Sequence, residues 1–411
     1  MRAQHTAHSF PAFPIYSCAF VADDKLVAGG GGGASRSGVK NKLKLFRISE
    51  SRTLDVLSEL ELEKDEDAPM SMTADPETKT IVCGINSTSA KLEKGENENC
   101  RKFSIGGGEH RFTQLGTHGT LSGGAEDYQR VTVLSPDARF LAVAGKYDLS
   151  LLSYDSLELL AQPLRVSNGE IYDATFSFSH LILVTSMNLL IYVLPGADSQ
   201  PPQQGEQKGG GSTALPELRL LKAIDLPSIP GVPAESVATF RAARLHPVEG
   251  NILYTAINVT LPRRPNEKVA KKQSYALKWR VLFLSQDINT FRARVESLRK
   301  LREGGLTCLD VSPDGKLLAF GASDYSLSVL DSVTLAPLIS ILKAHEFPIT
   351  TLRFNPASRL LVSGGVDSSL RVVTIPQNLG TQSWSYFIVI LLAIIAFLIA
   401  VLIPRWTAKD A

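Results

Sequence analysis

The sequence has few cysteines, and their spacing supports no cross-link or metal site. Four cysteines are scattered along 411 residues, without the two-residue separation of zinc sites and redox motifs. Isolated cysteines are typical of reduced thiols in a cytosolic domain rather than of a disulfide framework. We therefore expect buried, unreactive side chains at Cys18, Cys83, Cys100 and Cys308.

The chain also has little net charge. It contains 43 Lys and Arg against 41 Asp and Glu, so no overall field points to nucleic acid as a partner. One stretch, 262–272, is locally basic, but it has no interleaved aromatic residues for stacking bases. A solvated loop is favoured over contact with lipid headgroups or nucleic acid. The cations of this stretch are Arg263, Arg264, Lys268, Lys271 and Lys272.

Motifs of common enzymes are absent as well. The seven histidines are isolated, and neither a zinc-protease helix nor a nucleophile elbow occurs. Gly33 and Gly38 have the spacing of a phosphate-binding loop, but Val39 occupies the lysine position. A dinucleotide fingerprint placed on Gly29, Gly31 and Ala34 lacks the helix that must follow it. We therefore expect no enzymatic activity, no small-molecule substrate and no nucleotide binding by the chain itself.

Long apolar runs are rare, and there is one exception near the C-terminus. The first ten residues are polar and contain no apolar leader. Residues 386–403, in contrast, are uninterrupted by charge and would span about 27 Å as a helix, close to the thickness of a thin bilayer. This pattern predicts a transmembrane helix and a juxtamembrane linker at 377–385. By the positive-inside rule alone, Arg405 and Lys409 would place the tail 404–411 in the cytosol. Because the span lies after a large domain without a signal, we instead expect a cytosolic domain and a short lumenal tail at 404–411.

Short apolar strands separated by turn residues repeat along the rest of the chain. Pro313 and Pro356 mark equivalent turns 43 residues apart, within the period of a four-stranded propeller blade. Seven such units predict an all-β, seven-bladed WD-repeat-like propeller, whose last blade is completed by a strand near residues 2–8. His345 precedes an inner strand and is expected to make a structural hydrogen bond. The predicted blades are 12–62, 68–117, 129–165, 171–226, 237–301, 305–342 and 348–375.

Two further segments interrupt the repeats. The stretch 195–214 is rich in Pro, Gln and Gly, which predicts a flexible loop without a function of its own. The run 61–67 is mostly acidic and is interpreted as a solvated turn that could also shape a partner surface.

Five consecutive glycines, Gly29–Gly33, form the most distinctive feature of the sequence. They follow a strand-like run at 25–28 and precede another at 43–48. Glycine permits positive φ angles and close backbone approach, so such a run is either a slack linker or a loop built for contact. The Arg, Lys and Asn residues that follow favour the built loop.

This loop carries a resemblance to a known family. Its Lys25–Gly29 and Gly38–Leu43 segments closely resemble the signature of endoplasmic reticulum membrane proteins that act as guanine nucleotide exchange factors for the Sar small GTPase. The similarity covers nearly the whole chain. It extends to 65–69, 86–88, 101–103, 126–128 and 344–350.

The resemblance implies a site and a cofactor. The catalytic residue would be Asn41, which helps to displace nucleotide-binding elements of the GTPase, and a potassium ion would be held by Gly30, Gly31 and Asn41. Activation of Sar at the endoplasmic reticulum membrane would then begin assembly of the COPII coat. The GTPase-contacting residues would be Gly31, Gly32, Gly33, Ala34, Ser35, Arg36, Ser37, Gly38, Val39 and Lys40.

Two other functions stay open at this point. A tethered propeller could recruit coat or cargo components without accelerating nucleotide exchange. A DNA-binding role, as described for animal relatives, would depend on the basic stretch 262–272, and the predicted membrane span argues against it.

Overall fold

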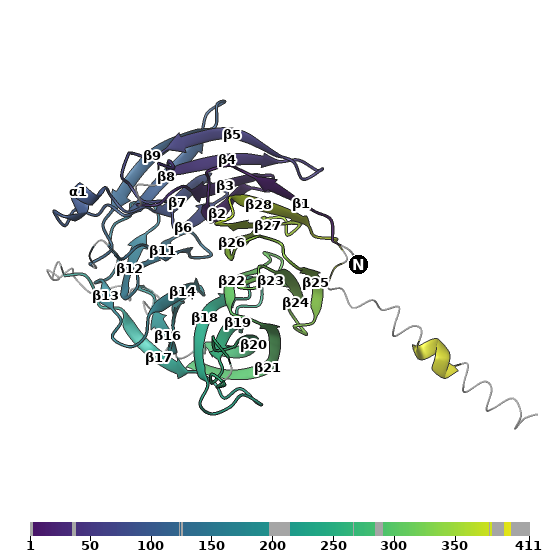
Figure 1. Cartoon of the computed structure of the whole chain (residues 1–411). Helices are drawn as coiled ribbons and strands as arrows, with labels where there is room; N and C mark the ends of the chain where they lie inside the picture. Colours follow the sequence, from purple (N-terminus) through teal and green to yellow (C-terminus); the bar gives the residue numbers. More distant parts are fainter. Residues whose placement is uncertain are drawn as a thin grey trace, which may run out of the picture. The chain divides into compact units, whose positions relative to one another are not determined.

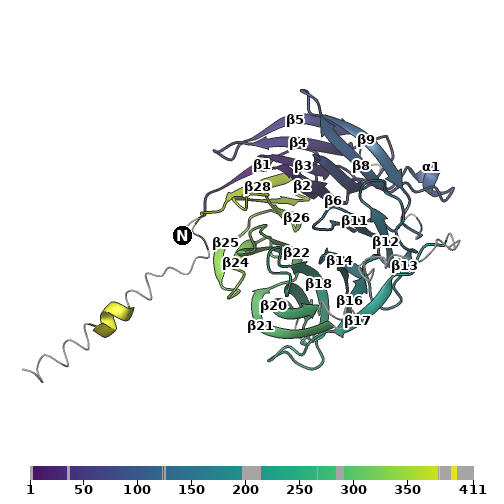
Figure 2. The same ribbon diagram turned by 180° about the vertical axis from the view of Figure 1, so that it is seen from behind.

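Seven four-stranded antiparallel sheets surround one axis in the computed structural model of the chain (Figures 1 and 2). The all-β, seven-bladed prediction is therefore confirmed.

Predicted features that lie outside the described residues are Ser35–Ser37, positions 197–213 of the insertion, most of the apolar segment 386–403, and the tail 404–411. The structure describes residues 3–34, 38–122, 124, 126–196, 214–265, 267–283, 291–377, 379 and 390–395.

Each of the first four blades is an up-and-down sheet of consecutive strands. A single-turn helix, α1 (Ser89–Leu92), lies between β7 and β8. The strands are β2 (Ile15–Ala22), β3 (Lys25–Gly30), β4 (Lys42–Ile48) and β5 (Leu54–Glu61); β6 (Ser71–Asp75), β7 (Thr80–Gly84), β8 (Cys100–Gly106) and β9 (Arg111–His118); β10 (Val131–Leu134), β11 (Phe140–Ala144), β12 (Asp148–Ser153) and β13 (Leu164–Arg165); β14 (Ile171–Phe176), β15 (His180–Thr185), β16 (Asn188–Val193) and β17 (Arg219–Asp225).

The fifth and sixth blades continue this order, and the seventh takes its outer strand from the N-terminus. The fifth blade has the longest strands, since β20 has 12 residues and β21 has 13, more than the usual strand length. The strands are β18 (Val237–Leu245), β19 (Ile252–Thr260), β20 (Lys272–Phe283) and β21 (Phe291–Glu303); β22 (Leu306–Val311), β23 (Leu317–Ala322), β24 (Leu327–Asp331) and β25 (Pro337–Ile341); β26 (Ile349–Phe354), β27 (Leu360–Gly365), β28 (Ser369–Thr374) and β1 (His5–Ser9).

The ring is closed by β1, which pairs antiparallel with β28 from His5 opposite Val373 to Ser9 opposite Ser369. The two strands lie side by side in both views (Figures 1 and 2). Arg52 of the first blade reinforces the closure, since its guanidinium donates to Thr6 and to Thr374. The predicted closing strand is therefore confirmed, a few residues further along than expected.

Hydrophobic cores fill the spaces between neighbouring blades, and the inner strands leave an axial cavity of about 440 Å³. One such core joins Val27 and Leu45 of the first blade to Ile81 and Phe103 of the second. Five inner strands, β2, β14, β18, β22 and β26, have a register shift near their start. Bulges of this kind redirect a side chain, here toward the axis of the ring.

Two smaller predictions can be checked in the propeller. The buried His345 ring contacts the Asp367 carboxylate through Nδ1 at 3.1 Å and the Ser363 hydroxyl through Nε2 at 2.8 Å, which confirms its structural role. All four cysteines are free; Cys18, Cys83 and Cys100 are buried as predicted, whereas Cys308 is only partly buried. Burial raises the pKa of the Cys18 thiol to about 11, so it is not a thiolate at neutral pH.

The chain divides into two compact units, Met1–Pro376 and Gln377–Ala411. All seven sheets, including the closing pair of β1 with β28, belong to the first unit. This unit is therefore complete as a folded domain. In the second unit, residues 390–395 are helical. Within the described part of the chain, no helix is both long and apolar enough to cross a membrane.

Removal of residues 1–9 tests the closure of the ring. Without β1, strand β28 loses its outer partner, and an unpaired edge opens beside the first blade. We expect the melting temperature of the domain 1–376 to fall by several degrees or more, as measured by circular dichroism. The substitution Lys91→Ala, at an exposed position of α1, serves as the control, and an unchanged melting temperature after the deletion would contradict the role of β1.

Candidate functional site

The glycine run ends β3 and begins the connection to β4, and its conformation requires glycine. Gly30 pairs with Lys42 of β4, while the next amide, that of Gly31, donates to the Pro14 carbonyl at 2.9 Å. A Cβ atom on Gly30 would collide with the Pro14 carbonyl oxygen. Gly31 has φ +140°, which side-chain-bearing residues rarely adopt. The run is therefore a built loop rather than a slack linker.

Asn41 closes the base of this loop with its side-chain amide. Its Oδ1 accepts from the Gly33 amide at 2.9 Å, and its Nδ2 donates to the Gly33 carbonyl at 3.0 Å. The same Nδ2 donates to the Glu66 carbonyl at 2.7 Å. Asn41 is 8% exposed, so its amide is directed into the protein. It joins the two ends of the loop to the acidic turn after β5.

That acidic turn contains a buried ion pair, although the sequence favoured a solvated turn that could also shape a partner surface. Glu66 contacts the Arg101 guanidinium of β8 at 2.7 Å, with side-chain exposures of 4% and 9%. Its other carboxylate oxygen accepts from the Glu63 amide at 3.0 Å. The solvated-turn interpretation holds for exposed Asp65 but is wrong for Glu66, because a charge on the adjacent blade compensates its burial.

The next residue, Asp67, extends the network under the loop. Its carboxylate accepts from the backbone amides of Ala68 and Ala34, and burial raises the pKa of this carboxyl. The Asp67 amide donates to the Asn86 carbonyl at 3.1 Å. The Asn86 side chain in turn donates to the Asp127 carbonyl at 2.8 Å. Hydrogen bonds thus run without interruption from the loop across the first three blades.

The segment that leads from the loop into β4 is held by ion pairs. Lys40 contacts Glu61 at 2.6 Å, and Lys44 contacts Glu59 at 2.7 Å. The hydrogen bond from Lys44 lowers the pKa of the Glu59 carboxyl. Ala34 and Gly38, in contrast, are exposed. The described loop therefore has a rigid base and an exposed outer part, which suits contact with another protein.

Two oxygens beside Gly31 are of the chemical type that the predicted potassium ion requires. Asn41 Oδ1 and the Lys40 carbonyl oxygen lie close to the point where a Cβ of Gly31 would lie, together with the Asn41 Cα. An amide oxygen has two lone pairs, and the Gly33 amide takes one of them. Uncharged carbonyl-type oxygens are the ligands that select potassium in channels. Among the described residues, no group of three His, Cys, Asp or Glu could hold a metal.

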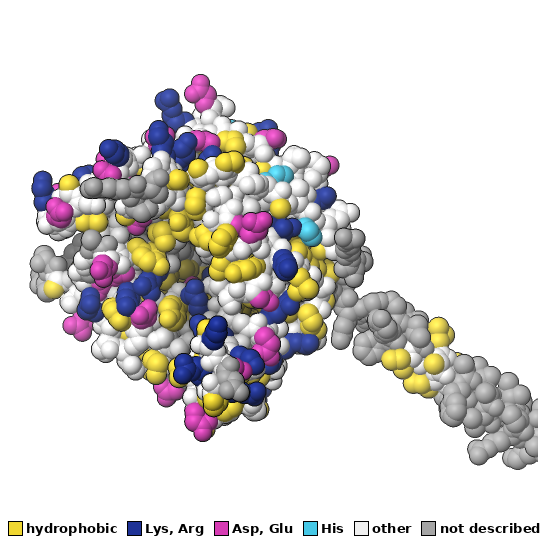
Figure 3. Space-filling view, viewed as in Figure 1, with side chains coloured by type: hydrophobic (Ala, Val, Ile, Leu, Met, Phe, Trp, Pro, Cys, Tyr) yellow, Lys and Arg dark blue, Asp and Glu magenta, His cyan; other side chains and the backbone are white. Residues whose placement is uncertain are grey.

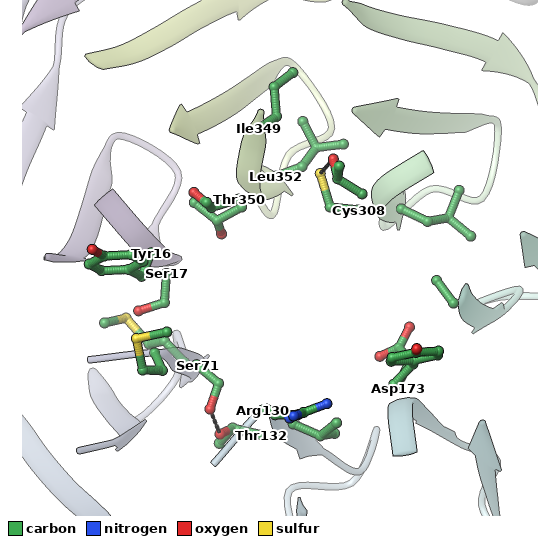
Figure 4. A pocket seen from close by; sticks show the side chains of 18 of the residues that line it. Tyr16, Ser17, Ser71, Arg130, Thr132, Asp173, Cys308, Ile349, Thr350 and Leu352 are labelled. Atoms are coloured by element: carbon green, nitrogen blue, oxygen red, sulfur yellow. Dashed lines mark hydrogen bonds between the residues drawn. The ribbon is translucent and has the colours of Figure 1, made fainter. Parts of the chain in front are cut away.

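The axial cavity is a second possible site, and its acidic side chains are paired with arginines of the same ring. Figure 4 shows Tyr16, Asp173 and Thr350 directed toward the axis from their inner strands, with Arg130, which directly precedes β10, beside them. The Asp173 carboxylate pairs with Arg244, which also contacts Asp310 at 3.7 Å. Apolar side chains surround the hollow at the centre of this face (Figure 3). Both carboxylates are thus compensated by Arg244, which supports a structural role for these three side chains.

The structure brings several of the predicted site residues together and adds a base that sequence reasoning missed. Asn41, Gly30 and Gly31 lie close to one another, and Gly32, Gly33 and Val39 are partly buried beside them. The buried pair Glu66 and Arg101 had no predicted role, although both residues belong to segments that carried the family resemblance. No signal in the sequence indicated their contact, because 35 positions separate them.

Comparisons with known proteins agree with this architecture and with the family resemblance. The WD40 family (WD domain, G-beta repeat) matches residues 296–331 and 336–373, so the last blades are WD40 repeats. The guanine nucleotide-exchange factor SEC12 of Candida glabrata is 33% identical over 146 residues. This match covers 34% of the chain and 31% of the relative, about a third of its length. The resemblance to an exchange factor is thereby confirmed over about a third of the chain.

Removal of the Glu66 carboxylate tests the buried base. We expect Glu66→Ala to destabilise the domain by about 3–5 kcal/mol, because Arg101 would stay buried without its partner. The apolar double variant Glu66→Leu, Arg101→Met should recover most of the loss. The midpoint of urea unfolding measures both effects.

The exposed pair Lys300 and Glu303 provides the matched control for this prediction, since Glu303 is 67% exposed. Glu303→Ala should change the stability by less than about 1 kcal/mol. Equal effects of Glu66→Ala and Glu303→Ala would contradict the importance of the buried pair.

Proposed function

We propose that this chain is a guanine nucleotide exchange factor for the Sar small GTPase. In this proposal it promotes GDP release and GTP loading at the endoplasmic reticulum membrane, and so initiates COPII coat assembly and transport to the Golgi. The observation that carries the proposal is a glycine loop with an exposed outer part, held at its base by the buried Asn41 amide. The partial similarity to a relative named as an exchange factor supports the same function.

Exchange requires no covalent chemistry from the chain. A partner shifts an equilibrium only by its differential affinity for the two states, so the loop need only bind the nucleotide-free GTPase better than the GDP form. A loop fixed in advance loses little conformational entropy on binding. The bonds from Gly33 to Asn41 and from Gly31 to Pro14 supply this preorganisation.

Asn41 acts through the loop in this account. Both of its amide donors are directed to main-chain oxygens, of Gly33 and Glu66, rather than to the surface. We therefore assign it the role of a positioning residue that keeps Gly31–Gly33 in the conformation presented to the GTPase. Direct contact with the GTPase is left to the exposed residues, among them Ala34, Gly38 and Lys40.

A potassium ion fits this arrangement as a second support for the loop. Asn41 Oδ1 and main-chain oxygens of Gly30, Gly31 and Lys40 would hold it. When bound, the ion would neutralise the clustered carbonyl dipoles and stiffen the loop. The chain itself also holds the glycine segment in place, because the Gly31 amide donates a hydrogen bond to the Pro14 carbonyl.

The apolar segment 386–403 is proposed to anchor the chain in the endoplasmic reticulum membrane, with the propeller in the cytosol and the tail 404–411 in the lumen. Tethering would raise the concentration of exchange factor at the bilayer. Activated GTPase would then form beside the membrane into which its amphipathic segment inserts.

Release of fluorescent GDP from purified Sar GTPase tests the proposal with the domain 1–376. We expect rapid release by the wild type, and a rate lowered about tenfold or more by Asn41→Ala, which removes three hydrogen bonds at the loop base. Gly31→Ala should have a similar effect, because a side chain there meets Asn41. The rate should be higher in potassium than in sodium buffer.

Gly106→Ala is the matched control, since Gly106 has open space around it. It should exchange nucleotide at the wild-type rate. Release no faster than the intrinsic rate, from a wild-type domain that melts normally, would exclude exchange and leave a scaffold that recruits coat or cargo. Equal rates in the two buffers would exclude potassium but not the loop.

A further inference from the structure

The positive charge of the chain is concentrated in its fifth blade. Residues 237–303 contain 14 Lys and Arg against 5 Asp and Glu, although the whole chain is nearly balanced at 43 against 41. The other blades are therefore acidic on average. In Figure 3, Lys and Arg side chains lie close together over the part of the face that Figure 1 assigns to β18–β21.

Strand pairing brings two basic segments of this blade together. The connection 261–271 between β19 and β20 ends beside Lys272, whose carbonyl accepts from the Gly304 amide at 2.7 Å. Register places Ala276 of β20 opposite Arg299, and Tyr275 opposite Lys300. We call this surface the basic edge, and it consists of Arg263, Arg264, Lys268, Lys272, Arg299 and Lys300.

Little of this charge is neutralised internally. Lys300 pairs with Glu303, and the neighbouring Lys271 pairs with Glu267 at 2.7 Å. No ion pair joins Arg263, Arg264 or Lys268 to an acidic residue of the described chain, and all three are exposed. Arg264 interacts electrostatically with Glu267, whereas the positive charges of Arg263 and Lys268 are available to an external anion.

The basic edge also exposes an apolar side chain. Val269 follows Lys268 directly and is 76% exposed. The connection that carries it is held in a defined turn, because the Leu261 amide donates to the Lys271 carbonyl at 2.8 Å. A projecting aliphatic residue among cations is typical of surfaces that rest at the headgroup level of a bilayer. No aromatic residue of 261–272 offers a stacking platform for nucleic-acid bases.

We propose that the basic edge binds the anionic phospholipid headgroups of a membrane, with Val269 inserted at the level of the acyl boundary. Clustered Lys and Arg are attracted by the negative surface potential of the cytosolic leaflet. This surface is separate from the glycine loop, so the inference does not depend on the proposed exchange function.

Vesicle co-sedimentation tests this inference with the domain 1–376, which lacks the apolar segment 386–403. We expect binding to vesicles of phosphatidylcholine with phosphatidylserine, weak binding to phosphatidylcholine alone, and release at high salt. The triple variant Arg263→Glu, Arg264→Glu, Lys268→Glu should reduce binding to the anionic vesicles about tenfold or more. Val269→Asp should reduce it at constant salt as well.

A charge-matched variant separates local recognition from net charge. Lys91→Glu, Lys94→Glu, Arg111→Glu changes the total charge equally at exposed positions of the second blade, and should keep wild-type binding. Melting temperatures show that each variant is folded. Equal losses for the two triple variants, equal binding to neutral vesicles, or binding to DNA but not to vesicles would each overturn the proposal.

Discussion

The contact between the Asn41 amide and the Glu66 carbonyl, at 2.7 Å, is the interaction on which the arrangement of the candidate site depends. It joins a loop that has few side chains of its own to a turn that cannot move freely, because Glu66 is paired with Arg101 of the neighbouring blade. A glycine-rich segment would otherwise have a large conformational entropy. The buried network lowers that entropy, and the exposed part of the loop receives a fixed base.

The closed ring makes such a base possible. Each blade contacts mainly its neighbours, so a polar bridge between two blades keeps its geometry only if the ring cannot open. Pairing of β1 with β28 provides this constraint. The glycine loop and the connection 261–271 both join the second and third strands of a blade, and therefore lie on the same face of the propeller. They belong to different blades, so substitutions can separate their roles.

The fold was largely predictable from the sequence, because the propeller pattern is local and repeated. Turn residues such as Pro313 and Pro356 mark equivalent positions, and a final blade with too few strands predicts that the N-terminus completes it. The loop was also predictable, since successive glycines cost conformational entropy and therefore mark a place where positive φ angles or a close backbone contact are needed. What could not be predicted was the burial of Glu66. An acidic run is usually solvated, and its compensation by Arg101 depends on the packing of two blades. The inward direction of the Asn41 side chain could not be predicted either, because it depends on where the same packing places the Glu66 carbonyl.

Hydrogen–deuterium exchange of the chain, alone and with nucleotide-free Sar GTPase, tests the central claim most directly, because it locates the contact without depending on turnover. The account predicts increased protection of the peptide that covers residues 30–41, with Asn41→Ala abolishing it, and no change in the outer strands of the fifth blade. Protection confined to other blades, with residues 30–41 unchanged in the complex, would contradict it.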